Sequence, residues 1–474
     1  MQSAERKAKT ADAADPAVLP VAATAPAPGL AADSALCTLT SALSPETVID
    51  LGLALRLAGA TNPTIALAQE QVNEALAGQL AARALLLPSV NVGGNVRVHR
   101  GVLMSGPGLV FPVSSQSLYL GAGTGAVGSG TLAFPGARLF AHLGDAAFEP
   151  LAAAQRVAAS RSEAGAVQND ILRDVATAYL DLVGAEATLA VLREGEAELA
   201  EVVRLAGVYA EKGQGRAGDA NRALANADLL RRDVRRGEEE IAVASARLCR
   251  LLSLDPATRL RTPGGPVEVV RLVPENQDLP TLVALAGQAR PEVSARAAEL
   301  AQAQTRVRQE RVRPWLPTVS VGYSRGAFGG GSDRVASNFG SLAGRSDFDV
   351  AAFWTVENLG VGNRARVRRA GAEVGQAVAE YNVTLNRVSR EVAEAFTESE
   401  AAAVQLTLAE AATRLADEGF ALERERIRQG EGRPLEVLDS FRQRLDSRRE
   451  RVRAAVAFDA AQFRLLAAVG QPAG

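Results

Sequence analysis

The chain has few of the residues that enzymes and metal proteins use most. Its 474 residues include only two histidines and two cysteines, which are His99, His142, Cys37 and Cys249. These positions lie far apart, so they indicate neither a metal-ligand cluster nor a structural disulfide. Histidine-based catalysis is disfavoured for the same reason, and we expect no cofactor and no metal.

Aromatic residues and net charge are also scarce. Only 4% of the residues are aromatic, while Ala, Arg, Glu and Leu fill long stretches. That composition is typical of extended or coiled-coil helices rather than of a thick globular core. The 52 basic and 54 acidic residues leave a net charge of −2. No basic field therefore indicates nucleic acid as a partner.

Long hydrophobic runs are missing too. The longest uncharged run, residues 101–137, is crowded with Gly, Ser and Pro, so it cannot hold a helix across a bilayer. We expect no transmembrane helix, which leaves a water-soluble protein or a membrane β-barrel. Residues 1–43 are rich in Ala and Pro and are predicted to be disordered. Acidic residues and prolines interrupt any apolar core there, so no export signal is evident in this chain.

What the chain does contain is a duplication. The segment Leu87–Gly93 returns as Leu316–Gly322, and Asp174–Tyr179 returns as Glu391–Phe396. A unit of about two hundred residues therefore occurs twice, which is too long for a solenoid repeat. We predict a first repeat over residues 44–256, a proline-rich linker over 257–280 and a second repeat over 281–472. Each repeat is expected to hold a helix, two strands and a helical hairpin.

The predicted strands alternate apolar and polar residues. Residues 89–99 keep period two, which indicates a strand with two different environments, and a second strand is expected within 130–143. The second copy gives strands over 318–328 and 348–357. It is twelve residues shorter, and the excess of the first copy is placed in its glycine-rich loop. The side chains predicted to face a membrane are Val90, Val92, Val96, Val98, Val319, Val321, Tyr323 and Trp354.

The predicted helices are unusually long. The first is expected over 44–86, with Ser44 as its N-cap and a kink at Asn62–Pro63. Residues 366–428 could form one helix of roughly 90 Å. Apolar residues recur at steps of three and four in two places, which predicts coiled-coil seams. The two seams are Ala227, Leu230, Val234, Gly237, Ile241, Ala244, Leu248 and Leu251, and Val404, Leu408, Ala411, Leu415 and Leu422.

Four strands of about ten residues have the length that tilted strands need to cross a bilayer. Membrane strands must belong to a closed barrel, and the smallest natural barrels have about eight strands. One chain supplies half of that number. The sequence therefore predicts a barrel shared between chains and extended by the long helices.

At this point the residues resemble the TolC-like outer membrane factors, also called outer membrane efflux proteins. Gly430–Ser440 is similar to the family's hairpin motif, and residues 213–223 carry a weaker version of it. Phe353–Gly360 is similar to the family's strand-to-helix junction. The resemblance implies a homotrimer with a 12-stranded outer-membrane β-barrel, four strands from each chain. A long periplasmic α-helical barrel of coiled-coil hairpins would continue it.

The resemblance also implies the function and the partners. The trimer would be the exit duct of a tripartite efflux pump or a type I secretion system, spanning outer membrane lipid and extending into the periplasm. It would meet a periplasmic adaptor (membrane fusion) protein and an inner-membrane pump of RND or ABC type. The hairpin tips Gly213, Gly215, Gly430, Gly432 and Pro434 would dock the adaptor.

The family's periplasmic entrance is narrowed by acidic rings, and those positions fall on Glu436 and Asp439. Asp219 and Arg433 are the further gate candidates. An aromatic residue and an arginine often latch that entrance in the family. Here the aromatic position holds Ile427, and the basic position holds Gly432 with Arg433 beside it. The chain thus departs from the family's latch.

Simpler interpretations stand beside these. Glu436 and Asp439 would equally suit a solvated helix face, and Trp354 and Tyr323 suit either an interfacial aromatic belt or buried packing. An enzyme is disfavoured, because no nucleophile, base and orienting group can be assembled from these residues. A soluble periplasmic coiled-coil scaffold explains the helices, but it leaves four alternating strands at equivalent places unexplained.

Overall fold

The computed structural model describes residues 46–90, 92–124, 134–135, 137–212, 216–334, 343–429 and 431–471. The segment 1–43, predicted to be disordered, lies outside the described residues. The same holds for Gly213, Gly215 and Gly430 among the hairpin-tip glycines.

The first helical segment begins later than expected. Residues Glu46–Val48 form strand β1, which pairs in parallel with β7 (Arg259–Arg261), so the predicted helix over 44–86 does not include this segment. Its predicted N-cap, Ser44, lies outside the described residues. Helix α2 (Leu51–Thr61) begins after Asp50, whose side chain accepts a hydrogen bond from the Leu53 backbone N–H at 2.7 Å. The predicted kink at Asn62–Pro63 is confirmed, because Asn62 is extended and α3 (Pro63–Arg83) starts anew. A short 3₁₀ turn, Ala84–Leu86, ends this segment.

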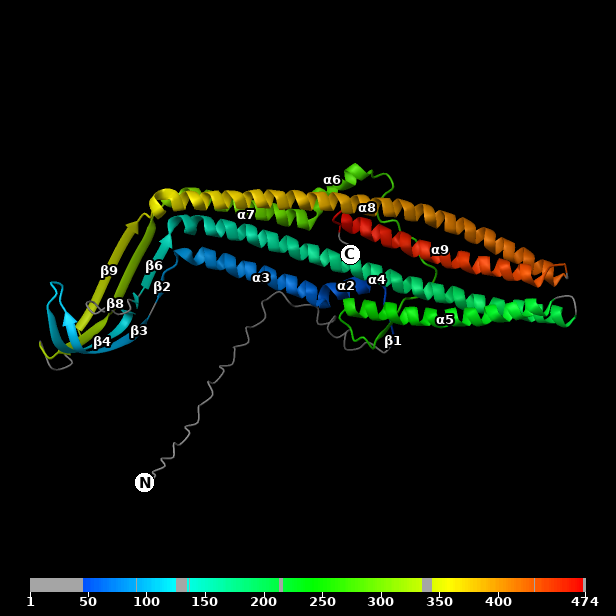
Figure 1. Cartoon of the computed structure of the whole chain (residues 1–474), viewed down its shortest axis with the longest axis horizontal. Coiled ribbons are helices and arrows are strands. Elements are labelled where there is room, and N and C mark those ends of the chain that lie inside the picture. Colours follow the sequence, from blue (N-terminus) through cyan, green and yellow to red (C-terminus); the bar gives the residue numbers. More distant parts are fainter. Residues whose placement is uncertain are drawn as a thin grey trace, which may run out of the picture. The chain divides into compact units, whose positions relative to one another are not determined.

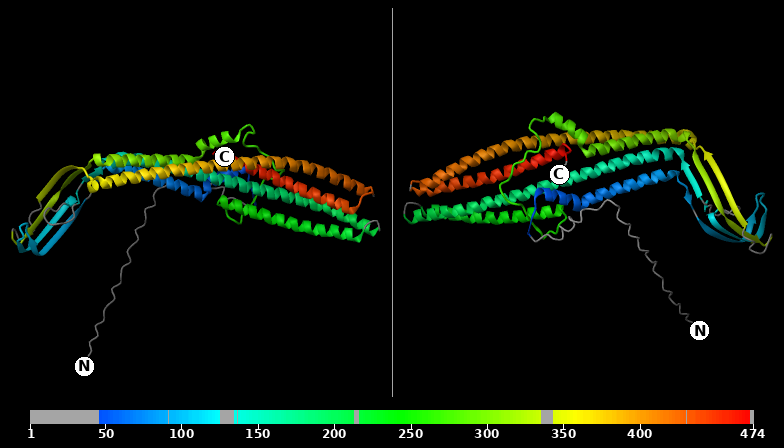
Figure 2. Two further views of the ribbon diagram at one scale, coloured as in Figure 1. Left: turned by 45° about the horizontal axis from the view of Figure 1, so that its top comes forward. Right: turned by 180° about the vertical axis from the view of Figure 1, so that it is seen from behind.

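Long helices dominate the rest of the chain (Figure 1). Helix α4 (Leu143–Glu211) has 69 residues and α8 (Val361–Arg428) has 68, about 100 Å each at 1.5 Å per residue. The predicted helix over 366–428 is confirmed and begins five residues earlier. The remaining helices are α5 (Ala217–Leu251), α6 (Leu279–Ala289), α7 (Pro291–Val312) and α9 (Pro434–Ala468). In Figures 1 and 2 the pairs α4–α5 and α8–α9 run side by side to their tips.

One predicted seam is confirmed, and the other is not covered within the single chain. Helix α5 buries Leu230, Val234 and Leu248 against α4, as its heptads predict. On α8 the predicted residues are exposed instead, with Leu408 at 64%, except for the half-buried Ala411. The stripe that α8 buries holds Leu406, Ala409, Ala416, Phe420 and Ile427. Heptad spacing fits both apolar stripes of this helix, and only the second one faces α9 and α4.

The strands form one antiparallel sheet beyond the ends of the long helices (Figure 1). Its members are β2 (Ser89–Val90), β3 (Val92–Met104), β4 (Val110–Thr124), β5 (Phe134–Pro135), β6 (Ala137–His142), β8 (Thr318–Ser332) and β9 (Ala343–Phe353). Strands β2 and β3 lie end to end, and so do β4 and β6. Strand β2 pairs with β6 and β3 pairs with β4, so each end-to-end pair takes the place of one strand in the sheet. The sheet is therefore four strands wide, in the order β2/β3, β4/β6, β8, β9.

The second strand is longer than predicted, because it consists of β4 and β6 together. Among the described residues, 130–143 hold β6, as predicted, and the short β5, while β4 lies in the segment predicted to be a glycine-rich loop. Ala122 of β4 pairs with Arg325, and Ala137 of β6 pairs with Tyr323, so a single residue of β8 spans the interruption. The extra residues of the first copy lie between β4 and β6, where they interrupt the strand, rather than in the turn between β3 and β4. In the second copy β9 ends at Phe353, so Trp354 lies beyond the strand.

Helix α4 lies at the centre of the helical part. It packs against α3, α5, α7 and α9. By length and composition alone α4 could cross a membrane, since one window has a mean hydropathy of 1.5, whereas the sequence analysis expected no such helix. Its packing is that of a core helix. The mainly helical fold with a β-sheet, predicted from the sequence, is confirmed.

Candidate functional site

The sheet register brings the predicted membrane-facing side chains onto one face. Val90 lies opposite Ala137, Ala137 opposite Tyr323, and Tyr323 opposite Phe348. Directly paired residues of an antiparallel sheet share a face. The large apolar side chains exposed on this face are Val90, Val92, Val96, Val98, Leu120, Tyr323, Phe348 and Val350. Val319 and Val321 belong to the same face and are half-buried.

The other face of the sheet is mainly polar. Arg97 lies opposite Ser117 and His99 opposite Ser115. Farther along, Gly322 pairs with Asp349 and Ser324 with Asp347. A Cβ on Gly322 would lie 2.7 Å from an Asp349 carboxylate oxygen, so the small residue leaves room for that carboxylate. Phe140, opposite Ser320, and Phe353, opposite Thr318, also lie on this face and are 62% and 43% exposed. The alternation seen in the sequence thus divides the sheet into a mainly apolar and a mainly polar side.

The sheet has two open edges. Among the described residues, β3 pairs only with β4, and β9 pairs only with β8. Each edge therefore presents unpaired backbone N–H and C=O groups along its length. Trp354 follows β9 and is exposed, and its indole N–H donates to the backbone oxygen of Trp315 at 3.2 Å. Both tryptophans thus mark the junction of sheet and helices.

The hairpin tips lie at the far end of the long helices (Figure 2). Gly432 is buried where the chain turns from α8 into α9, and a Cβ there would lie 2.9 Å from the Ile427 backbone nitrogen. Only glycine permits that approach. Pro434 is the buried first residue of α9, where a missing N–H costs nothing. The tips are therefore built by tight local packing, and what they dock is not tested by the single chain.

The four gate candidates surround these tips without contacting one another. Glu436 and Asp439 are exposed on one side of α9, and Asp439 lies 3.7 Å from Arg442. Asp219 begins α5 and lies 3.9 Å from Arg222. Arg433 precedes α9 and is exposed. Within the described residues no hydrogen bond or ion pair joins one gate candidate to another, so their gate role stays a prediction.

Two contacts missed by the sequence analysis tie the hairpins together. The Tyr209 hydroxyl near the end of α4 donates to the backbone oxygen of Ile427 near the end of α8, at 2.8 Å. Arg442 of α9 donates to the Asn226 side-chain oxygen of α5 at 2.8 Å through its Nε. An aromatic side chain thus does meet Ile427, but α4 supplies it. The contact joins residues more than two hundred positions apart, which no local pattern indicates.

A second group that the sequence analysis missed is a cluster of charges farther from the tips, which we call the charge cluster. Its members are Glu194 and Glu198 of α4, Asp417 of α8, and Arg444 and Arg448 of α9. It therefore links three helices from both hairpins. The signal in the sequence is slight, since Arg444 takes a buried position on α9 between apolar residues.

The charge cluster is centred on Arg444, whose side chain is 10% exposed. Its Nε lies 2.6 Å from Asp417 and it also pairs with Glu198, while the guanidinium carbon lies 5.0 Å from the centre of the Phe420 ring. Arg448 lies 2.9 Å from Asp417 and 2.7 Å from Glu194. Burial alone would raise the pKa of Asp417, but the hydrogen bonds from Arg444 and Arg448 outweigh it and leave that pKa below its ordinary value.

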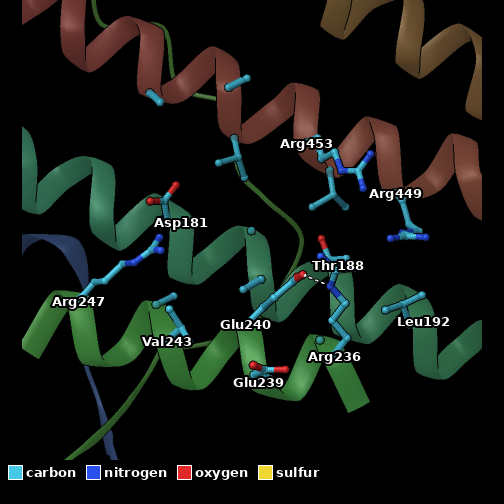
Figure 3. A pocket seen from close by; sticks show the side chains of 18 of the residues that line it. Asp181, Thr188, Leu192, Arg236, Glu239, Glu240, Val243, Arg247, Arg449 and Arg453 are labelled. Carbon is cyan, nitrogen blue, oxygen red and sulfur yellow. Dashed lines mark ion pairs between the residues drawn. The ribbon is translucent and has the colours of Figure 1, made fainter. Parts of the chain in front are cut away.

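A recess of about 770 Å³ lies between α4, α5 and α9 (Figure 3). Arg236 and Glu240 of α5 form an ion pair at 3.3 Å, drawn as a dashed line. Asp181 and Arg247 face the same recess from α4 and α5, and Arg449 and Arg453 reach it from α9. Its wall mixes both signs of charge. Among the described residues no group of three His, Cys, Asp or Glu side chains could hold a metal ion.

Comparison with known proteins shows what this chain is similar to. Residues 282–471 match the family described as outer membrane efflux protein. No curated protein matches the sequence. Among solved structures, a membrane protein from Pseudomonas aeruginosa superposes with a TM-score of 0.71 at 21% identity, covering 89% of this chain and 94% of that one.

Two further structures agree with that fold. The outer membrane protein VceC of Vibrio cholerae gives a TM-score of 0.69 at 19% identity, covering 89% of this chain and 96% of that one. The Campylobacter jejuni outer membrane channel CmeC gives 0.70 at 17%, covering 89% and 85%. Residues 282–471 of this chain are therefore similar to the outer membrane efflux protein family, and the chain as a whole has the fold of these solved outer membrane proteins.

Proposed function

We propose that this chain is one subunit of an outer-membrane exit duct for a tripartite efflux pump or a type I secretion system. The sheet would form part of the pore wall in the outer membrane, and the long helices would extend that pore into the periplasm. The observation that carries this proposal is the two-sided sheet. Its exposed apolar side suits lipid, its polar side suits an aqueous lumen, and β6 and β9 lead into α4 and α8.

The open edges support a closed assembly of several copies. In hydrocarbon every backbone group needs an internal partner, so a lone sheet with unpaired edges is excluded from a membrane. Pairing β3 of one copy with β9 of the next would satisfy both edges. Three copies of a sheet four strands wide would give twelve strands, which is within the range of natural membrane barrels.

Apolar stripes on the helices also support association between copies. On α8 the exposed residues Val404, Leu408, Leu415 and Leu422 form one stripe. On α5, Leu229 and Val243 lie on one side of the helix and are exposed. Stripes of this length on soluble helices are usually covered by a partner. In a homotrimer α8 of one copy would pack beside α5 of the next and complete the helical tube.

The tips would form the periplasmic entrance. Three copies would bring Glu436 and Asp439 around one axis, with Asp219 and Arg433 beside them as further gate residues. The charge cluster and the Tyr209 hydrogen bond to Ile427 would hold the two hairpins of each copy together and keep the entrance narrow. Opening would then require these contacts to break.

The partners follow from the position of the tips. We infer that the turns at Gly213, Gly215, Gly430, Gly432 and Pro434 dock a periplasmic adaptor protein. The adaptor would join the duct to an inner-membrane pump of RND or ABC type. The chain's role would be passage of substrate, with no catalytic step.

Mass measurement and conductance together test this proposal. Protein extracted from the outer membrane in mild detergent should have the mass of three chains. In planar lipid bilayers it should form discrete conducting channels. A folded monomer that needs no detergent and forms no channels would instead support a soluble periplasmic scaffold and reject the duct.

A further inference from the structure

The segment that joins the two halves of the chain covers a pocket on α4. Residues 262–272 lie over the side of α4 that carries Leu180, Val183 and Ala187, whereas the recess of Figure 3 is lined by Asp181, Gly184 and Thr188. Between this segment, α4 and α9 is a cavity of about 640 Å³. We call it the linker pocket. Its volume is within the range of sites for small organic ligands.

The linker pocket combines apolar walls with acidic groups. Its apolar lining includes Leu180, Val183, Val267, Leu272 and Phe463. Its ionisable lining residues are Asp459 of α9, Glu186 and Tyr179 of α4, and Glu268 of the joining segment. No lysine, arginine or histidine is among the described residues that line it. An apolar enclosure with carboxylates and no basic side chain favours a cationic ligand.

Asp459 is the carboxylate that the fold leaves without a counter-charge. Asp459 is 3% exposed, and its Oδ1 accepts one hydrogen bond, from the Val270 backbone N–H at 2.9 Å. Within the described chain no other hydrogen bond or ion pair reaches this carboxylate. Arg271, next to Val270, is engaged elsewhere, 2.8 Å from Glu275 and over the Phe458 ring.

Glu186, another carboxylate of the linker pocket, has more hydrogen bonds than Asp459. It accepts hydrogen bonds from the Thr262 backbone N–H at 3.2 Å and from the Thr262 hydroxyl, so its charge is already supported. A buried carboxylate with one hydrogen bond is costly, because burial removes water and a single N–H does not replace it. Burial accordingly raises the pKa of Asp459 to about 6, although the Val270 hydrogen bond lowers it. A bound cation would remove this cost.

We propose that the linker pocket binds a small organic cation, with its ammonium group at Asp459 and its hydrocarbon or aromatic body against Val267, Leu272 and Phe463. A divalent metal is a poor fit, because a hard cation needs several oxygen ligands and the walls around Asp459 are apolar. The ligand would connect the joining segment to α4 and α9. This site is separate from the pore and does not depend on the exit-duct proposal.

The test uses a matched pair of probes on the intact protein in detergent. Isothermal titration with 4-phenylbutylamine should show saturable binding, and the uncharged 4-phenylbutan-1-ol should bind about tenfold more weakly or not at all. Asp459→Asn keeps an acceptor for the Val270 N–H but removes the charge, so it should weaken amine binding about tenfold or more. Glu450→Gln, which removes an exposed carboxylate of α9 outside the pocket, should leave binding unchanged.

A second variant and a pH series keep the test decisive. Val267→Phe should reduce binding of both probes by filling the pocket, even if Asp459→Asn fails to fold. Amine affinity should fall about tenfold between pH 7.5 and pH 5, because protonated Asp459 no longer attracts the cation while the amine stays charged. Equal binding of amine and alcohol would overturn the charge assignment. Absence of amine binding to the intact protein would overturn the site itself.

Discussion

Replacing Arg444 with Met should loosen the hairpins at the tips. Methionine keeps an apolar stem near Phe420 but removes the charge that faces Asp417 and Glu198. Removing one partner of a buried ion pair costs about 3–5 kcal/mol, because the other charge stays buried without compensation. Arg448 remains 2.9 Å from Asp417 and supports part of that charge. We therefore expect about 3 kcal/mol, the lower end of the range.

Hydrogen exchange of backbone amides measures this loss where it occurs. A decrease of about 3 kcal/mol in the free energy of local opening corresponds to exchange on the order of a hundredfold faster. The effect should be confined to the amides of α8 and α9 near residues 415–445. Arg453→Met is the matched control, since Arg453 is on the same helix, is exposed and pairs only with the nearby Glu450 among the described residues.

A double variant separates ion pairing from simple packing. Adding Asp417→Asn to Arg444→Met removes the carboxylate left unpaired, so the double variant should exchange more slowly than Arg444→Met alone. If the duct proposal also holds, Arg444→Met should raise the conductance of the channel in planar bilayers. Exchange near the tips within about twofold of the parent would refute the idea that the charge cluster holds the hairpins together.

Three further outcomes can be checked with similar material. Val96→Arg should destabilise the folded protein in lipid by about 2–4 kcal/mol, whereas Asn95→Arg should be tolerated, and equal tolerance would place the sheet outside a membrane. Replacing Glu436 and Asp439 together by Ala should change single-channel conductance and weaken block by multivalent cations with assembly intact, and an unchanged channel would leave both as solvated residues. The pKa of Asp459 is raised from 3.8 to about 6, so the folded state holds its proton more tightly and the contribution of this residue to stability should decline as pH rises from about 4 to about 6. Asp459→Asn should abolish that decline and stabilise the protein at pH 7.5 by about 3 kcal/mol in thermal unfolding, and an unchanged pH dependence would contradict the assignment.

Features of short sequence period could be predicted well. The alternation from Val90 to Val98 gave both the strand and the exposed face, because a period of two fixes the side of each residue. The long helix ending at Arg428 followed from its uninterrupted helix-forming residues. The seam on α5 followed from heptads that a single neighbour covers.

Features that depend on distant neighbours could not be predicted. Leu406 and Leu408 both belong to apolar stripes of α8, and only the packing of α9 decides which is buried. Strand β4 was missed because glycine and serine are weak strand formers, and its pairing with β3 and β8 supplies the stability instead. The contact between Glu198 and Arg444 joins residues 246 positions apart, so no local pattern contains it.

The interrupted strand line has a consequence for engineering. Gly123 and Thr124 at the end of β4 pair with Pro135 and Phe134 of β5. The segment between residues 124 and 134, which we call the branch, is therefore closed where it leaves the sheet. On both sides of this base the pairing with β8 continues in one register. The length of the branch is thereby uncoupled from the register of the sheet. Residues could be inserted between 124 and 134 without shifting the pairing of β4 or β6 with β8.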